Sequence, residues 1–85
     1  MAAGTYTKSF VANNFLLQEN GRYMALVPAT THKLGIDFHV VKMLRRDDNM
    51  NWENMVGNYK ILTNGDLEVW TDEQCICKIY LVGES

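Results

Sequence analysis

The sequence lacks an excess of charge of either sign, and it lacks any long apolar run. Eight Lys and Arg residues against ten Asp and Glu residues leave a formal net charge of −2. A nucleic-acid-binding domain usually carries a basic excess or a basic stripe, so the charge disfavours nucleic acid as a partner. No apolar run approaches the roughly 20 residues of a membrane-spanning helix, and no basic amphipathic segment is present. We therefore expect no membrane partner.

The chain is also short, and its start lacks the basic and apolar regions of a signal peptide. Its 85 residues predict a single domain covering residues 1–85. A domain of this size buries only about 60–65 % of the surface of its unfolded chain, so its stability margin is thin. Disulfides, a metal or oligomerisation often compensate. The opening Met1-Ala2-Ala3-Gly4 favours a cytoplasmic location.

Cysteine is scarce, with two residues in the chain. A single residue separates Cys75 from Cys77, which on a strand places their Cα atoms about 6.6 Å apart. Their Cβ atoms would then run parallel, too far apart for a relaxed disulfide. With His32 and His39 the two thiolates could complete a tetrahedral zinc site, but zinc sites normally separate their cysteines by two or more residues. The favoured interpretation is two buried thiols in a reduced protein, with no metal and no cofactor.

Two Asn-Gly pairs are the clearest structural signals. Asn64-Gly65 lies between two apolar runs in residues 58–70, and Asn20-Gly21 lies similarly in residues 15–27. A two-residue Asn-Gly loop supplies the positive φ angles of a type I′ turn, which matches the twist of paired strands. We predict that both segments are hairpins closed by such turns.

The type I′ turns also predict which side chains share a face, because side chains alternate along a strand. Around Asn64-Gly65, Leu62 would face Leu67 and Tyr59 would face Trp70. Neither face is cleanly polar, which indicates that another part of the chain or another subunit covers the second face. The predicted faces are Leu62, Leu67 and Val69; Tyr59, Ile61 and Trp70; and, as the core face of the first hairpin, Phe15, Leu17, Met24 and Leu26.

The remaining segments indicate short strands. Composition favours strands over residues 5–12 and 75–82. Residues 36–45 fit a strand or a helix, and their β-branched residues favour the strand. A loop is expected over residues 29–35 and one helical turn over residues 51–57. The predicted fold is mainly β: a small antiparallel barrel or curled sheet of about six strands, with at most one or two short helical segments.

No catalytic motif is evident. Asp37 and His39 would share a strand face and could transfer a proton, but no nucleophile can be assigned to them. Residues 47–51 place oxygen ligands at alternate positions, as a calcium loop begins. Trp52 then stands where a calcium loop needs glycine, and Asn58 stands where it needs glutamate. The sequence therefore favours a solvated turn at this point and a non-enzymatic protein.

The aromatic residues bear most on function. Trp and Tyr are enriched at protein interfaces because they combine apolar area with a polar group. Together with the thin stability margin, they favour a non-enzymatic interaction module that self-associates, most simply as a twofold-symmetric dimer. The expected interface residues are Tyr59, Ile61, Trp70, Trp52 and Tyr80.

A small-molecule pocket is the first alternative. Pockets inside barrels are mostly apolar and carry a few polar groups. Tyr23, His39 and Met43 are the residues that we expect to bind such a ligand.

Single-stranded nucleic acid ranks third. Lys42, Arg45 and Arg46 form a basic cluster that could act together with aromatic residues on which bases stack. Asp47 and Asp48 cancel this charge locally, and a charged strand end that discourages edge pairing explains the cluster equally well.

Overall fold

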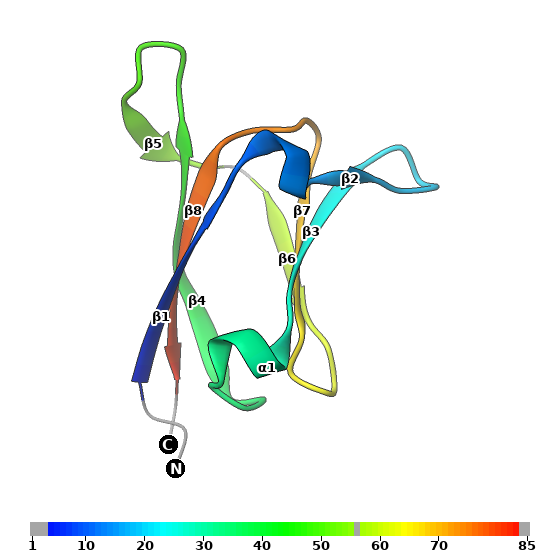
Figure 1. Cartoon of the computed structure of the whole chain (residues 1–85), viewed down its shortest axis with the longest axis vertical. Coiled ribbons are helices and arrows are strands. Elements are labelled where there is room, and N and C mark those ends of the chain that lie inside the picture. The colour runs from blue at the N-terminus through cyan, green and yellow to red at the C-terminus, as the bar shows by residue number, and fades with distance from the viewer. Residues whose placement is uncertain (1–3, 56, 84–85) are drawn as a thin grey trace.

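The computed structural model describes residues 4–55 and 57–83, and its strands form two antiparallel sheets that face each other (Figure 1). Sheet A has the strand order β1-β8-β4-β5, and sheet B has the order β2-β3-β7-β6. The elements are β1 (Gly4–Phe10), a 3-10 turn (Ala12–Asn14), β2 (Leu16–Leu17), β3 (Tyr23–Val27), α1 (Ala29–His32), β4 (Phe38–Arg46), β5 (Trp52–Asn54), β6 (Asn58–Ile61), β7 (Leu67–Thr71) and β8 (Cys77–Gly83).

The prediction of a mainly β, antiparallel fold is confirmed, and its finer form needs correction. The described residues contain eight strands where about six were expected. They lie in two sheets, and no ladder of paired strands joins one sheet to the other within the described residues, so they form no closed barrel. The first three residues of the segment compared with a signal peptide lie outside the described residues.

Three local predictions have different outcomes. Residues 36–45 are extended, since β4 runs through most of them. Residues 29–35, expected as a loop, contain the single helical turn α1. Residues 51–57, expected as a helical turn, instead contain strand β5, although Val56 lies outside the described residues.

Asp47 explains why the chain returns as a strand after β4. Its carboxylate accepts hydrogen bonds from the backbone N–H groups of Asn49 and Asn51, both at 2.9 Å. An aspartate that bonds nearby backbone in this way stabilises a tight turn. The turn brings Trp52 into register with Arg46, so residues after it add a fourth strand to sheet A.

The core lies between the inner faces of the two sheets. Strand β8 shows the expected alternation, because Cys77, Ile79 and Leu81 are buried while the residues between them are not. Burying a large aliphatic side chain contributes about 1.5–3 kcal/mol, so this layer accounts for much of the stability. The buried apolar residues are Phe10, Phe15, Ala25, Val27, Leu34, Phe38, Leu67, Val69, Cys77, Ile79 and Leu81.

Both Asn-Gly hairpins form, but neither has a type I′ turn. The N–H group of Gly21 donates to the Gln18 carbonyl at 3.0 Å, and that of Gly65 donates to the Leu62 carbonyl at 2.9 Å. Among the residues of these two turns only the glycines have positive φ, 83° and 93°. This is the three-residue loop in which a type I turn is followed by a glycine bulge.

The asparagine side chains account for the difference. Asn20 Oδ1 accepts a hydrogen bond from the Arg22 N–H group, and Asn64 Oδ1 accepts one from the Asp66 N–H group, both at 3.0 Å. Each bond spans the glycine and holds the asparagine in the turn. The asparagine therefore acts through its side chain rather than through a left-handed backbone.

The three-residue loop shifts the pairing of both hairpins by one residue, which moves the side chains of one strand to the opposite face relative to those of its partner. Tyr59 pairs with Val69 and Ile61 pairs with Leu67, so these four share the inner face, whereas Trp70 lies on the outer face. The predicted grouping of Tyr59 and Ile61 with Trp70 is therefore wrong. In the first hairpin Phe15 is buried as expected, whereas Leu17 on β2 is exposed. The buried residues of β3 are Ala25 and Val27 in place of Met24 and Leu26.

A docked turn closes one end of the space between the sheets. Helix α1 lies at this end, beside the loop that joins β6 to β7 (Figure 1). His32, 3 % exposed, has its Nε2 atom 2.7 Å from the Gly65 carbonyl oxygen, and its Nδ1 atom accepts a hydrogen bond from the Leu34 N–H group at 3.0 Å. These partners assign the neutral ring with its proton on Nε2. The Asp66 carboxylate also accepts a hydrogen bond from the Ala29 N–H group at 2.8 Å, which satisfies a free donor at the start of α1.

We predict that Gly65→Ala destabilises the protein more than Gly21→Ala does. Both glycines have positive φ in matching turns, so both substitutions carry a backbone cost of about 1–2 kcal/mol. A methyl group on Gly65 would also lie 2.7 Å from the Gly35 carbonyl oxygen, whereas nothing lies within 4 Å at Gly21. Such overpacking adds about 1–3 kcal/mol. Urea unfolding of both variants measures the difference in the free energy of unfolding.

The Gly21→Ala variant is the control for backbone strain. Equal destabilisation by the two substitutions would show that the docked turn tolerates the extra methyl group and does not hold this end of the fold.

Candidate functional site

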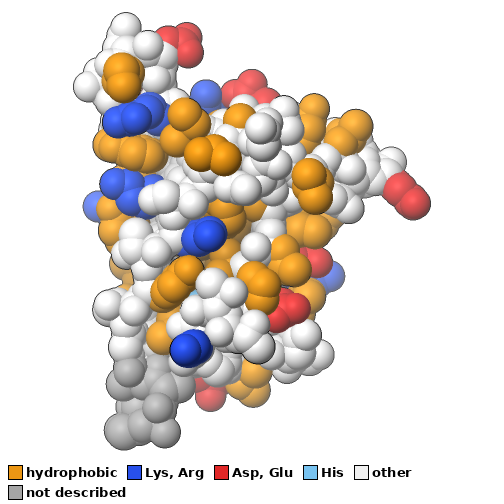
Figure 2. Space-filling model, viewed as in Figure 1, with side chains coloured by type: hydrophobic (Ala, Val, Ile, Leu, Met, Phe, Trp, Pro, Cys, Tyr) orange, Lys and Arg blue, Asp and Glu red, His pale blue; other side chains and the backbone are white. Residues whose placement is uncertain are grey.

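The outer face of sheet A combines basic, aromatic and hydroxyl side chains. Tyr80 lies in the central strand β8, and its register partners are Thr7 on β1 and Lys42 on β4. In the next row of the sheet Lys78 lies beside Ser9. Figure 2 shows Lys and Arg side chains along the side of the molecule that sheet A forms, interleaved with hydrophobic side chains. We call this surface the basic face; its central residues are Lys42, Arg46, Trp52, Lys78 and Tyr80.

Two cations of the basic face stack on one aromatic ring. The Lys78 Nζ atom lies 4.3 Å from the centroid of the Trp52 ring, and the Arg46 guanidinium carbon lies 5.0 Å from it. Lys78 Nζ is also 6.0 Å from the Tyr80 centroid. Such cation–π contacts are worth about 0.5–1 kcal/mol at exposed sites, enough to orient these side chains. Lys78 thus stands between two aromatic rings.

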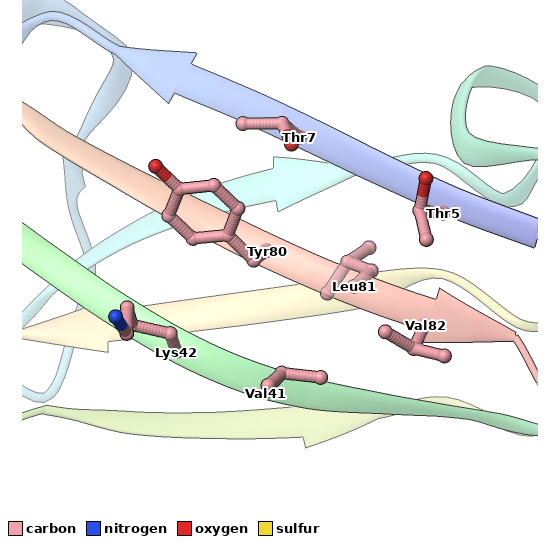
Figure 3. A pocket seen from close by; sticks show the side chains of 7 residues that line it. All are labelled: Thr5, Thr7, Val41, Lys42, Tyr80, Leu81 and Val82. Carbon is pink, nitrogen blue, oxygen red and sulfur yellow. The ribbon is translucent and has the colours of Figure 1, made fainter.

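A shallow hollow of about 510 Å³ lies on the same face, around Tyr80. Figure 3 shows the Tyr80 ring between Thr7 and Lys42, with its hydroxyl group pointing along the sheet surface. A bulge in the pairing between Val40 and Lys42 leaves Val41 61 % exposed at the rim. The lining residues are Thr5, Thr7, Val41, Lys42, Tyr80, Leu81 and Val82.

The basic cluster seen in the sequence is divided by the alternation of β4. Lys42 and Arg46 point outward, whereas Arg45 pairs with the buried Cys77 and points to the other side. There Arg45 meets two carboxylates, Glu73 at 3.1 Å and Glu53 at 3.6 Å.

Lys78 takes the place of Arg45 on the basic face, and it is not among the residues predicted from the sequence. The alternation of Lys78 and Tyr80 along the last strand is the signal that could have identified it.

On the outer face of sheet B, one row of neighbouring side chains across the strands is apolar, and the next row contains charged side chains. Leu16, Met24 and Trp70 are direct neighbours across β2, β3 and β7. The next row contains Leu26, Glu68 and Lys60. The Trp70 indole N–H group donates a hydrogen bond to the Glu68 carboxylate at 3.1 Å, so its polar atom is satisfied. We call this surface the apolar face; its residues are Leu16, Met24, Leu26, Lys60, Glu68 and Trp70.

The five predicted interface residues lie on three different surfaces. Trp70 lies on the apolar face, and Trp52 and Tyr80 lie on the basic face. Tyr59 and Ile61 lie on the inner side of the edge strand β6, where Ile61 packs against the core and Tyr59 is 48 % exposed.

The three predicted ligand-binding residues do not line one cavity. Tyr23 and Met43 pack against the core between the sheets. His39 is exposed and lies beside Val82 on the outside of sheet A. Two of the three residues therefore help to fill the core, and the third lies on the outside of sheet A.

The two cysteines are buried to different degrees. Burial, and next the neighbouring Cys75, raise the pKa of the Cys77 thiol from 9.0 to about 12. Burial also raises the pKa of Cys75, and the positive charge of Arg45 opposes part of that shift. Both thiols are therefore protonated at neutral pH and weakly nucleophilic. Within the described residues no three His, Cys, Asp or Glu side chains gather to hold a metal ion.

Known proteins supply no further guide. No protein-family model matches this chain, and comparisons with curated proteins and with solved structures found no match. In the described part of the chain, no helix has the length and apolar character needed to span a membrane. Function must therefore be inferred from the two outer faces.

We predict that the Cys77 thiol makes the fold sensitive to alkali. The folded state keeps a proton that the unfolded chain loses above about pH 9. The free energy of unfolding therefore falls as pH rises from 9.0 towards about 12, with a slope of up to about 1.4 kcal/mol per pH unit. Urea unfolding of the wild type and of Cys77→Ala at several pH values measures the slope.

The comparison uses the slope of the free energy of unfolding against pH rather than its absolute value, because the cavity left by Cys77→Ala lowers stability at every pH. The variant should decline less steeply than the wild type above pH 9.0. Parallel declines would mean that other groups carry the whole effect.

Proposed function

We propose that the protein is a non-enzymatic interaction module that self-associates as a homodimer through the apolar face. The observation that carries this proposal is the row of Leu16, Met24 and Trp70, in which three large apolar side chains cross three neighbouring strands. Leu16 is 63 % exposed and Leu26, beside this row, is 44 % exposed. Contiguous apolar side chains on a sheet surface favour burial against a partner, since that burial removes apolar area from water.

The charges beside the apolar row favour a second copy as the partner. In a twofold-symmetric dimer the same patch meets itself, so each residue faces a matched position on the other copy. Glu68 and Lys60 are neighbours on β7 and β6, and they carry opposite charges. A twofold axis near the row allows Glu68 of one copy to meet Lys60 of the other. The apolar face is therefore self-complementary, because its apolar row would meet the same row of the second copy and its Glu68 would meet Lys60 there.

Trp70 is well suited to the centre of this interface. Its indole N–H group already bonds to Glu68, so burying the ring would leave no unpaired donor. Trp is also among the residues that most often dominate binding energy at interfaces.

Leu16→Asp should convert the dimer to a monomer, because a carboxylate at this site would be buried in the apolar interface. The matched control is Leu17→Asp, since Leu17 is 64 % exposed on the same strand but faces the other way. We expect Leu16→Asp to raise the dimer Kd at least tenfold, about 1.4 kcal/mol, with little change for Leu17→Asp. Native mass spectrometry and light scattering measure the assembly.

A monomeric wild type at high protein concentration would refute the proposal. Equal loss of assembly in both variants would also count against it, because it would place the interface elsewhere.

A charge exchange tests the twofold arrangement itself. Lys60→Glu should weaken the dimer, because it would place two carboxylates together across the axis. Adding Glu68→Lys to the same chain should restore the affinity, since the opposite pairing is regained. A double variant no tighter than Lys60→Glu would show that these two residues do not meet.

A further inference from the structure

We propose that the basic face of sheet A binds single-stranded nucleic acid. This inference goes beyond self-association, and it concerns the opposite side of the molecule. It rests on the sign of the charge, on the alternation of aromatic and basic side chains, and on the shape of the surface.

The charge of the basic face is opposite in sign to that of the whole chain. Lys42, Arg46 and Lys78 point outward from sheet A, and no Asp or Glu occupies an outward position on its described strands. The chain nevertheless carries a net charge of −2, and the carboxylates of its described residues lie outside this face. A surface with cations of one sign attracts a polyanion even when the protein is acidic overall.

Among the described residues, no carboxylate neutralises these cations. No carboxylate among the described residues forms an ion pair with Lys42, Arg46 or Lys78, whereas Arg22 and Arg45 both have such partners. The Arg46 Nε atom is buried without a hydrogen-bond acceptor in the described structure. Its charge is stabilised by the Trp52 ring. The face therefore keeps its positive potential for a ligand.

The aromatic rings identify which polyanion fits. Trp52, Lys78, Tyr80 and Lys42 follow one another across the sheet, so rings and cations alternate. Single-stranded nucleic acid alternates in the same way, with flat bases that stack on aromatic rings and phosphates that pair with cations. A duplex would keep its bases stacked inside, and a sulfated polymer has no base to stack.

The shape of the surface also fits a strand of nucleic acid. The hollow around Tyr80 is open and shallow, and the side chains of Thr5 and Thr7 border it on β1 (Figure 3). Their hydroxyl groups can bond to sugar or base atoms on the side of Tyr80 away from Lys42. A base lying on Tyr80 would thus have a cation on one side and hydroxyl groups on the other.

The first experiment titrates the full chain against fluorescein-labelled oligothymidine and oligouridine of about 12 nucleotides, a length within the usual range for one small β domain. Fluorescence anisotropy is recorded at several salt concentrations. Three neutralised phosphates predict that log K falls with log salt with a slope of about −2. Tighter binding of oligouridine would indicate contacts to the 2′-hydroxyl, and equal binding would indicate contacts to base and phosphate alone; both support the proposal.

Substitutions separate stacking from charge. Lys42→Ala and Lys78→Ala should each weaken binding and reduce the salt slope by about 0.7. Tyr80→Leu should weaken binding about fivefold or more without changing the slope. The controls are Lys33→Ala, an exposed lysine outside the face, and Tyr59→Leu, an exposed tyrosine on sheet B; neither should change the affinity.

A second measurement guards against variants that fail to fold. In a Trp70→Phe background Trp52 is the one remaining tryptophan, so quenching of its fluorescence by the unlabelled oligonucleotide reports contact at the face itself. Absence of binding at low salt would overturn the proposal. So would binding that heparin matches in affinity and that Tyr80→Leu leaves unchanged, because that result describes a charged surface without stacking.

Discussion

One end of the fold is closed by the contact between the imidazole of His32 and the backbone of Gly65. This hydrogen bond, 2.7 Å long, joins the one α-helical turn of the described structure to the loop of the β6–β7 hairpin. The Asp66 carboxylate strengthens the same junction from the other side by bonding to Ala29. Because sheet A begins again after α1 and sheet B contains the hairpin, the junction links the two sheets at this end. Each sheet packs one side against the core and turns its second side towards solvent. These second sides are the basic face and the apolar face.

The local sequence predicted the hairpins but not their register. An Asn-Gly pair is compatible with two loops that differ in length by one residue. The choice between them depends on whether the asparagine adopts a left-handed backbone or bonds to the turn through its side chain. Asn20 and Asn64 both use the side chain, and Gly65 must in addition fit against Gly35. That second requirement comes from a segment 30 residues away in the chain, so no local pattern contains it. Strands with strong period-two patterns, such as β8, were predictable because their inward residues are all apolar.

The candidate faces were only partly predictable for the same reason. The sequence suggested two separate groups, the expected interface residues Trp52 and Tyr80 and the basic cluster with Lys42 and Arg46. Their assembly into one face requires strand pairings, β8 beside β4 and β5 beside β4, that link positions far apart in the chain. Lys78 joins them only through those pairings. The net charge of −2 contains no information about this face, since it sums over faces with different chemistry.

The pairing of β1 with β8 has a consequence for how the chain folds. Gly4 is in register with Gly83, so β1 cannot find its partner until β8, about 70 residues later, has been synthesised. The two hairpins of sheet B, in contrast, close over short loops and lose little chain entropy in doing so. Contacts of such long sequence separation slow folding. The two hairpins should therefore order early, while residues 4–10 remain an unpaired strand that is exposed to aggregation until β8 is available.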